Sequence, residues 1–379
     1  MLLWEDKIGK IVVAGHICLD ITPEIHGRGT DIGNILSPGS LVEVGDADIH
    51  TGGAVANTGL AMKLLGVDVT LAGKIGEDSF GDMVTSITEK YGASDGLIKS
   101  PGDSTSYSIV LALPGADRIF LHNPGANDTF CADDLPMDAI KEAALFHFGY
   151  PPIMKRMYEN DGDEFVKIMR LVKETGTATS LDLAAVDAGT DAGRADWGMI
   201  LKRTLPYVDI FVPSIEELMF MLDRKKYEMI GERSAGRDFT DSVDVKDDVE
   251  PLGRMCLDMG AGIVLIKCGA SGMYYCTADK ASIDKAAGKL ELKPDEWADK
   301  SGFERSFVPD KILSGTGAGD TSVAAFLTGM INGYSMQKCV TYAAATGACC
   351  VSAYDALSGL KTFDEIDARI NAGWKHNPI

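Results

Sequence analysis

The sequence lacks the patterns that mark several common classes of protein. No C-x-x-C pair occurs among its eight cysteines, which excludes a zinc ribbon and a dithiol redox motif. No apolar run reaches the roughly 18 residues that a membrane-spanning helix needs. Positive charge is scarce, since 36 Lys and Arg stand against 56 Asp and Glu. A nucleic-acid binder needs a cationic stripe to displace counterions, so we expect neither nucleic acid nor an anionic membrane as a partner.

The cysteines that are present lie mostly in apolar surroundings, such as Cys349 and Cys350 in "ATGACCVSA". They are typical of small buried hydrophobic residues in a reducing compartment. The first residues, "MLLWEDKIGKIVV", show no signal-peptide architecture. We therefore expect a cytoplasmic protein, and a chain that is 45% apolar can build a large core.

Short apolar runs alternate with helical patterns along most of the chain. Runs rich in β-branched residues predict strands, and apolar residues at helical spacing predict helices between them. The predicted strands lie in 10–15, 67–76, 107–114, 144–149, 177–184, 208–213 and 262–269, and the predicted helices lie in 54–66, 161–175, 192–204, 214–222 and 251–260. This alternation favours an α/β fold with a mostly parallel sheet covered on both faces.

Four segments interrupt the alternation. Residues 17–50 and 104–130 hold short strands and Gly/Pro turns, which predicts a small β lid that leaves the main sheet. Residues 223–250 and 276–305 are charged and are interpreted as surface insertions, the first of them a mobile loop rather than a functional element. We expect a single domain over 1–379 with the two lid segments as excursions.

The stretch "SGTGAGDTSVAAFLTGM", from Ser314 to Met330, places glycines and Asp320 at the start of an amphipathic helix. Glycines leave the first helical N–H groups uncovered, so an anion can approach the backbone. No G-K-[ST] follows and no third glycine completes G-x-G-x-x-G, which excludes both common nucleotide loops. A plain helix cap by Asp320 is the alternative, although Thr316 and Thr321 are also able to cap.

A second glycine pair, Gly52 and Gly53, comes just before another predicted helix, with Asn57 in the first turn. An asparagine side chain offers both a donor and an acceptor, which suits a sugar hydroxyl. Asp20 follows the first predicted strand, and the carboxyl ends of strands in open α/β sheets bind ligands. A simple turn and a helix cap explain these residues equally well.

Together these stretches resemble the PfkB/ribokinase family of ATP-dependent sugar and nucleoside kinases, with a signature of the fructokinase type. The resemblance covers roughly residues 10–360 and implies a ribokinase-like fold. It is carried by "GGAVAN", "GKIGEDSFGD", "NPGAND", "PSIEE", "IKCGASG" and "GTGAGDTSVAAF", in that order along the chain.

The resemblance implies a catalytic centre at the later glycine turn. Asp320 would accept the proton of a sugar hydroxyl that attacks the γ-phosphate of ATP, and Gly317, Ala318 and Gly319 would supply amides to an anion hole. Because Asp320 stands at a helix N-terminus, we expect its ionised form to be favoured. Such a weak base suits phosphoryl transfer, which needs the nucleophile oriented more than deprotonated.

The resemblance also implies ATP and Mg²⁺ as cofactors. Glu217 matches the glutamate that holds the hydrated metal, while Ser214 replaces the family asparagine, which puts the metal coordination in doubt. The implied nucleotide contacts are Ser214, Glu217, Lys267, Gly269, Gly272, Thr316, Gly317, Gly319 and Ala345. A plain alanine-rich helix explains Ala345 equally well. Ser314 and Gly315 depart from the segment that binds a monovalent cation in relatives, so potassium activation is not inferred.

On the sugar side, the resemblance implies contacts from Asp20, Gly52, Gly53, Asn57 and Asn127. Arg118 and His122 are further candidates from the lid, and solvent-exposed positions explain them equally well. "GYPPI", residues 149–153, lacks the Lys/Arg cluster that would bind a phosphosugar. The sequence therefore favours an unphosphorylated sugar, and the resemblance implies that a fructose- or ribose-like monosaccharide is phosphorylated at a primary hydroxyl.

Two other functions stay open at this point. A nucleoside kinase on the same fold would need aromatic surface for the base, which Phe120, Phe130 and Tyr150 offer. A catalytically silent sugar-binding regulator is disfavoured by the intact turn around Asp320. The family resemblance also implies a homodimer through the lid, which the apolar strands of 104–121 support.

Overall fold

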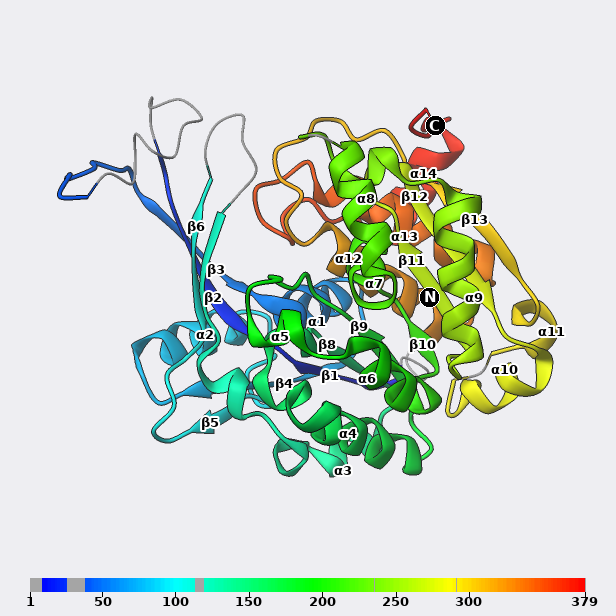
Figure 1. Ribbon diagram of the computed structural model, residues 1–379, viewed down its shortest axis with the longest axis horizontal. Coiled ribbons are helices and arrows are strands. Elements are labelled where there is room, and N and C mark those ends of the chain that lie inside the picture. Colours follow the sequence, from blue (N-terminus) through cyan, green and yellow to red (C-terminus); the bar gives the residue numbers. More distant parts are fainter. Residues whose placement is uncertain (1–8, 26–37, 113–118, 235, 291, 379) are drawn as a thin grey trace, which may run out of the picture.

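A nine-stranded sheet runs through the molecule and is the frame on which the other elements are placed (Figure 1). The computed structural model describes residues 9–25, 38–112, 119–234, 236–290 and 292–378. The strand order is β13-β12-β11-β10-β9-β8-β1-β4-β5. The bounds are β1 Ile11–Gly15, β4 Val69–Gly76, β5 Ile98–Ser100, β8 Leu145–Gly149, β9 Ala178–Asp182, β10 Ile210–Phe211, β11 Ile263–Lys267, β12 Gly272–Thr277 and β13 Ser301–Arg305.

The central strands are parallel and buried on both faces, which explains their continuous apolar sequences. Successive side chains of a strand point to opposite faces. Val12 and Ala14 of β1 accordingly belong to one hydrophobic cluster, and Ile11 and Val13 belong to the other. The predicted α/β fold with a mostly parallel sheet is confirmed. Near one edge β12 runs opposite to the other strands of this sheet, so its pairings with β11 and β13 are antiparallel.

Two layers of helices cover the sheet. Those packed on the first cluster are α3 Met137–Glu142, α4 Asp163–Glu174, α6 Trp197–Thr204, α7 Ile215–Leu222, α8 Arg224–Ser234 and α9 Glu250–Asp258. Those packed on the second are α1 Gly53–Leu64, α2 Ser79–Glu89, α10 Lys280–Ala287, α11 Pro294–Trp297, α12 Ala318–Ile331 and α13 Met336–Cys350. The remaining helices are α5 Asp191–Arg194 and α14 Phe363–Asn371. Across the described ranges, no helix combines the length and the apolarity that crossing a bilayer demands.

A separate four-stranded sheet forms the predicted lid. Its strands are β2 Cys18–Pro23, β3 Ala47–Gly52, β6 Tyr107–Leu111 and β7 Ile119–Asn123, in the order β3-β2-β6-β7. In Figure 1 these blue and cyan strands project away from the main sheet at one side. The division into one domain with lid segments 17–50 and 104–130 stays a prediction.

Three local expectations were wrong. The predicted helix 192–204 is two helices, because Asp196 caps the second one by accepting a hydrogen bond from the Met199 N–H at 3.0 Å. Residues 223–250 hold α8 and two further helical turns instead of a mobile loop. Residues 276–305 include β13, which pairs with β12 and extends the main sheet.

The second of these segments also contributes to the core. Trp297 of α11 is 1% exposed and packs edge-on against Phe326 of α12, with ring centroids 6.3 Å apart. The charged residues around Trp297 therefore lie on the outer face of segment 276–305, which is part of the folded core structure.

Replacement of Trp297 by alanine tests this assignment. We expect Trp297→Ala to lower the free energy of unfolding by about 3–5 kcal/mol, because it empties a large buried site. The exposed neighbour Glu296, changed to alanine, is the matched control and should shift it by less than about 0.5 kcal/mol. Urea denaturation measures both, and equal small effects would show that 276–305 is a dispensable surface insertion.

Candidate active site

The glycine turn before α12 has a backbone that other residues do not readily adopt. Gly317 is the N-cap of α12 with φ 74°, and no side chain caps the helix. A Cβ on Gly317 would lie 2.2 Å from the Cβ of Ala356, so glycine is required for space as well as for conformation. The Ala318 N–H donates to the Gly315 carbonyl at 3.2 Å. The amides of Gly319 and Asp320 lie in the first turn, where a helix has no carbonyl of its own to bind them.

Asp320 lies at the bottom of this turn and is 3% exposed. Its carboxylate accepts hydrogen bonds from Asn57 Nδ2 at 3.0 Å and from the Tyr150 hydroxyl at 2.8 and 2.9 Å. Burial raises the pKa of Asp320 above its ordinary value, while Lys267 and these two donors lower it. We expected the helix N-terminus to favour the ionised form, and burial acts against that effect by raising the pKa of Asp320. Asp320 is therefore a stronger base than its position on the helix suggested.

A buried ion pair stands beside the turn. Lys267, the last residue of β11, places Nζ 2.7 Å from both carboxylate oxygens of Asp182, the last residue of β9. A Cβ on Gly319 would lie 3.6 Å from Lys267 Nζ, so the ammonium borders the start of α12. Burial alone lowers the pKa of Lys267, but the carboxylates of Asp182 and Glu217 outweigh it and raise the pKa. The ammonium is therefore a permanent positive charge where an anion would meet the helix.

Ser214 and Glu217 form a capping box at the start of α7. The Ser214 N–H donates to Glu217 Oε2 at 2.8 Å, and the Glu217 N–H donates to Ser214 Oγ at 3.2 Å. Ser214, which stands where the family has an asparagine, therefore has a structural role as the N-cap of α7. Across the described ranges no group of three His, Cys, Asp or Glu side chains is arranged to hold a metal. Mg²⁺ commonly binds through one or two carboxylates, water and phosphate oxygens, and Glu217 fits that mode.

The other predicted nucleotide contacts are distributed over two elements. Gly269 and Gly272 flank the turn between β11 and β12 and have φ values of 56° and 135°. A Cβ on Gly269 would lie 2.6 Å from Thr240 Oγ1, which places the segment 223–250 next to this turn. Ala345 is fully buried in a cluster with Phe307, so its placement agrees with the plain helix rather than with an adenine contact.

The residues of the first glycine pair lie together at the base of the lid. Asp20 is on lid strand β2 and not at the end of β1, which corrects the expectation about its place. Its carboxylate lies against Gly52, where a Cβ would be 2.2 Å from Oδ2. A Cβ on Gly53 would lie 2.5 Å from His16 Nδ1, and Gly53 has φ 83°. Both glycines are therefore needed so that polar side chains can reach the backbone.

Two histidines join the lid to the main sheet. His16 Nε2 lies 3.3 Å from His122 Nε2, and His122 Nδ1 lies 3.1 Å from Ser108 Oγ. Burial lowers the pKa of both histidines, so both are neutral near pH 7. The structure thus brings His122 to the site from the lid side, as predicted, while Arg118 lies outside the described residues.

Asn127 has a different role from the predicted one. Its side chain is fully buried, accepts from the Ile17 N–H at 3.1 Å and donates to the Ile17 and Pro124 carbonyls at 2.9 and 3.0 Å. Both amide hydrogens are therefore used, and none is left for a sugar. Asn127 instead fixes the backbone where the chain enters lid strand β2.

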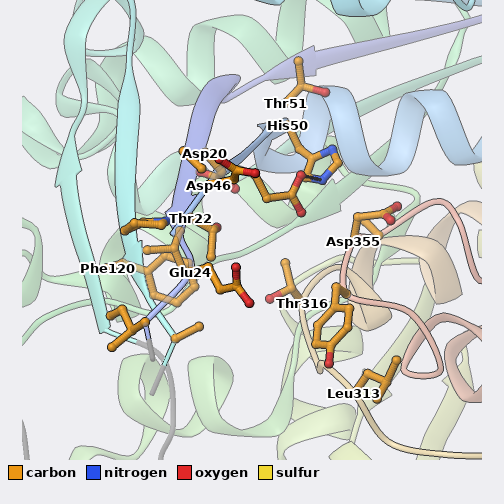
Figure 2. A pocket seen from close by; sticks show the side chains of 18 of the residues that line it. Asp20, Thr22, Glu24, Asp46, His50, Thr51, Phe120, Leu313, Thr316 and Asp355 are labelled. Atoms are coloured by element: carbon orange, nitrogen blue, oxygen red, sulfur yellow. Dashed lines mark ion pairs between the residues drawn. The ribbon is translucent and has the colours of Figure 1, made fainter. Parts of the chain in front are cut away.

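Two adjoining cavities open between the lid and the start of α12. The first, of about 710 Å³, is lined by Asp320, Gly317, Tyr150, His16 and His122 among others. The second, of about 880 Å³, is strongly acidic, with Asp46, Asp48 and Asp355 in its wall. Asp20, Asn57, Phe120 and Thr316 line both cavities. Figure 2 shows side chains that converge from two sides, Phe120 and Glu24 from the lid and Thr316 and Asp355 from the opposite loops.

Sequence reasoning missed the roles of three residues at strand ends. Asp182 ends β9, Tyr150 directly follows β8 and His16 directly follows β1. In a parallel sheet these ends share one edge, which is the edge where such folds bind ligands. The rule that singled out Asp20 would have found all three if it had been applied to every predicted strand.

Comparison with models of known protein families shows which family the chain belongs to. The model of the pfkB family carbohydrate kinases matches residues 9–362. The chain therefore belongs to the pfkB family of carbohydrate kinases, which are phosphotransferases that use ATP.

Relatives and solved structures agree with this family. The chain is 27% identical over 305 residues to an uncharacterized sugar kinase of Archaeoglobus fulgidus, covering 79% of this chain and 98% of the relative. It is 25% identical over 368 residues to a 5-dehydro-2-deoxygluconokinase of Clostridium perfringens, covering 96% and 93%. The fold resembles Arabidopsis thaliana ribokinase with ribose and ATP (TM-score 0.68, 20% identity, 95% and 98% covered). It also resembles a candidate ribokinase II of E. coli with ATP and Mg²⁺ (TM-score 0.69, 20% identity, 96% and 99% covered).

The buried ion pair gives a testable prediction about stability. We expect Asp182→Asn to lower the free energy of unfolding by about 3–5 kcal/mol, because it leaves the Lys267 ammonium buried without its counter-charge. The double variant with Lys267→Met should recover part of the loss. The exposed pair Lys280–Asp295 is the control, and Asp295→Asn should leave the unfolding free energy nearly unchanged. Thermal or urea unfolding measures the change in the free energy of unfolding of each variant. An effect of Asp182→Asn as small as that of Asp295→Asn would contradict the prediction.

Proposed function

We propose that the protein transfers the γ-phosphate of ATP to a primary hydroxyl of an unphosphorylated, fructose- or ribose-like monosaccharide. The observation that carries this proposal is the position of Asp320, whose buried carboxylate borders both the start of α12 and the cavity under the lid. A base and an anion-binding helix terminus in one place are what transfer of a phosphoryl group to an alcohol requires.

Each residue at the turn has a task in this reaction. Asp320 accepts the proton of the alcohol, and the raised pKa makes it a more effective base near neutral pH. The amides at the start of α12 and the Lys267 ammonium bind charge on the transferred group. Glu217 would hold a hydrated Mg²⁺, and Ser214, Gly269, Gly272 and Thr316 would border the nucleotide. Bound ATP with Mg²⁺ supplies the phosphoryl group.

The charge of the cavities supports a neutral sugar. Among the described residues that line the two cavities there is no lysine or arginine, whereas Asp20, Glu24, Asp46 and Asp355 are present. A carboxylate or phosphate on the substrate would face Asp46 and Asp355, and no lysine or arginine of the described lining would balance its charge. The wall therefore favours a polyol such as fructose or ribose over a sugar acid of the gluconate type, which the name of the Clostridium perfringens relative indicates for that protein.

Two alternative functions, a nucleoside kinase and a silent sugar-binding regulator, are distinguished from the proposed function by the test below. A nucleoside would place its base against Phe120, which lines both cavities and is half exposed. A silent regulator would bind a sugar without turning over ATP. The homodimer through the lid and the cytoplasmic location are proposals that rest on the sequence and its family resemblance.

A substrate panel separates these functions. Coupled ADP release should be fastest with a neutral monosaccharide, and slower with 5-dehydro-2-deoxygluconate, sugar phosphates and nucleosides. A preference for nucleosides selects the nucleoside kinase. Binding of a sugar, seen as a thermal shift, without any ADP release selects the regulator.

Asp320→Ala tests the assignment of the base. We expect kcat to fall at least about 100-fold, because proton transfer from the alcohol loses its acceptor. Sugar binding measured by thermal shift should be largely retained. Asp364 is a matched control, since it is an exposed aspartate in the first turn of α14, and Asp364→Ala should keep kcat. A near-normal kcat for Asp320→Ala would falsify the assignment.

A further inference from the structure

Tyr150 has an unusual backbone conformation for a large aromatic residue. It directly follows β8 and adopts φ 68° and ψ 39°, the left-handed region. The other non-glycine residues with positive φ in the described ranges are asparagine or aspartate, which tolerate that region. Pro151 follows, and a residue before proline is further restricted. The fold therefore holds Tyr150 in a conformation that its own sequence disfavours, which is common at functional sites.

This conformation delivers the phenol to the carboxylate of Asp320. The Tyr150 hydroxyl lies 2.8 Å from Oδ1 and 2.9 Å from Oδ2, and the Tyr150 N–H donates to the Asp182 carbonyl at 3.3 Å. Burial, followed by the nearby carboxylates of Asp320 and Asp182, raises the pKa of Tyr150 well above its ordinary value. The phenol therefore keeps its proton and acts as a donor.

The two carboxylate oxygens of Asp320 are not equivalent. The Tyr150 hydroxyl has one hydrogen, which is shared between Oδ1 at 2.8 Å and Oδ2 at 2.9 Å. Oδ2 also accepts from Asn57 Nδ2 at 3.0 Å, whereas the only other donor near Oδ1 among the described residues is the Thr58 hydroxyl, at the limit of 3.5 Å. A carboxylate oxygen accepts about two hydrogen bonds, so Oδ1 is the oxygen with room for a further donor.

We propose that Tyr150 is a positioning residue for Asp320, which turns the carboxylate so that Oδ1 is presented to the substrate alcohol. This inference rests on the proposed function, in which Asp320 is the base. Since the phenol bonds to the ionised carboxylate, it also favours that form over the protonated one.

Other charged and titratable groups surround Asp320, and a substitution of Tyr150 leaves their chemical identity unchanged. Lys267 at the end of β11 lowers the pKa of Asp320, and Glu217 of α7 raises it. Asp182 at the end of β9 pairs with Lys267, and Cys350 of α13 is a buried neutral thiol whose pKa is raised mainly by burial. Loss of the phenol removes a donor from the ionised form, so the pKa of Asp320 rises. The ionised base then requires a higher pH.

Tyr150→Phe is the direct test, and kcat/KM is measured against pH with ATP and the best sugar of the panel. The acid limb should move to higher pH by about one unit, the size expected for one hydrogen bond to a charged group. Below the limb the rate should fall about tenfold, and the KM for ATP should stay constant. Tyr342→Phe is the matched control, because its hydroxyl bonds Asp367 at 2.8 Å outside the site, and its acid limb should not move.

A second variant and a second measurement distinguish failure of the positioning role of Tyr150 from failure of the proposed kinase function. Tyr150→Leu removes the same hydroxyl with a different packing change, and circular dichroism checks that each variant is folded. An unmoved acid limb in active Tyr150→Phe overturns the positioning role and leaves the kinase proposal standing. If the unaltered protein has no turnover, the proposed function fails. The pKa of the Asp320 carboxyl group, measured by ¹³C NMR, then still tests the positioning role of Tyr150. An equal carboxyl pKa in unaltered protein and Tyr150→Phe overturns the inference.

Discussion

The site depends on one constraint, which is that the carboxylate of Asp320 is almost entirely removed from water. It lies at the N-terminus of a helix, where anions bind favourably. Asp320 is 3% exposed and lies in the first turn of α12. An isolated buried carboxylate would take up a proton, so neighbouring groups must favour its charge. Asn57 and Tyr150 supply donors, and Lys267 supplies the nearby cation. The site therefore has a defined charge before any ligand arrives.

The parallel sheet makes this arrangement possible. Tyr150, Asp182 and Lys267 lie at the carboxyl ends of three strands, β8, β9 and β11, and Glu217 lies in the first turn of α7, which follows β10. Side chains at the carboxyl ends of parallel strands converge without long loops. The described residues of the lid add the opposite wall, with acidic side chains and the neutral His122 and without a lysine or arginine that an anionic substrate would need. The same network thus supports both the proton acceptor and the preference for a neutral sugar.

The sequence predicted the sheet, the lid and the start of α12, because these follow from local periodicity and glycine turns. It did not predict β13, since the charged residues around Ser301–Arg305 hide a strand at the sheet edge. It misassigned Asn127, because the partner of that side chain is the backbone of Ile17, 110 residues away. The role of Tyr150 at Asp320 and that of Asp182 at Lys267 were missed for the same reason, as these partners lie 170 and 85 residues away in the chain. The balance between burial and the helix terminus at Asp320 likewise depends on tertiary packing.

A crystal structure with a neutral monosaccharide, ADP, Mg²⁺ and aluminium fluoride measures the central arrangement most directly. The account predicts the sugar's primary hydroxyl within hydrogen-bond distance of an Asp320 oxygen, and the fluoride group against the amides that open α12. A sugar hydroxyl directed away from Asp320, or a fluoride group bound elsewhere than at the start of α12, would contradict it.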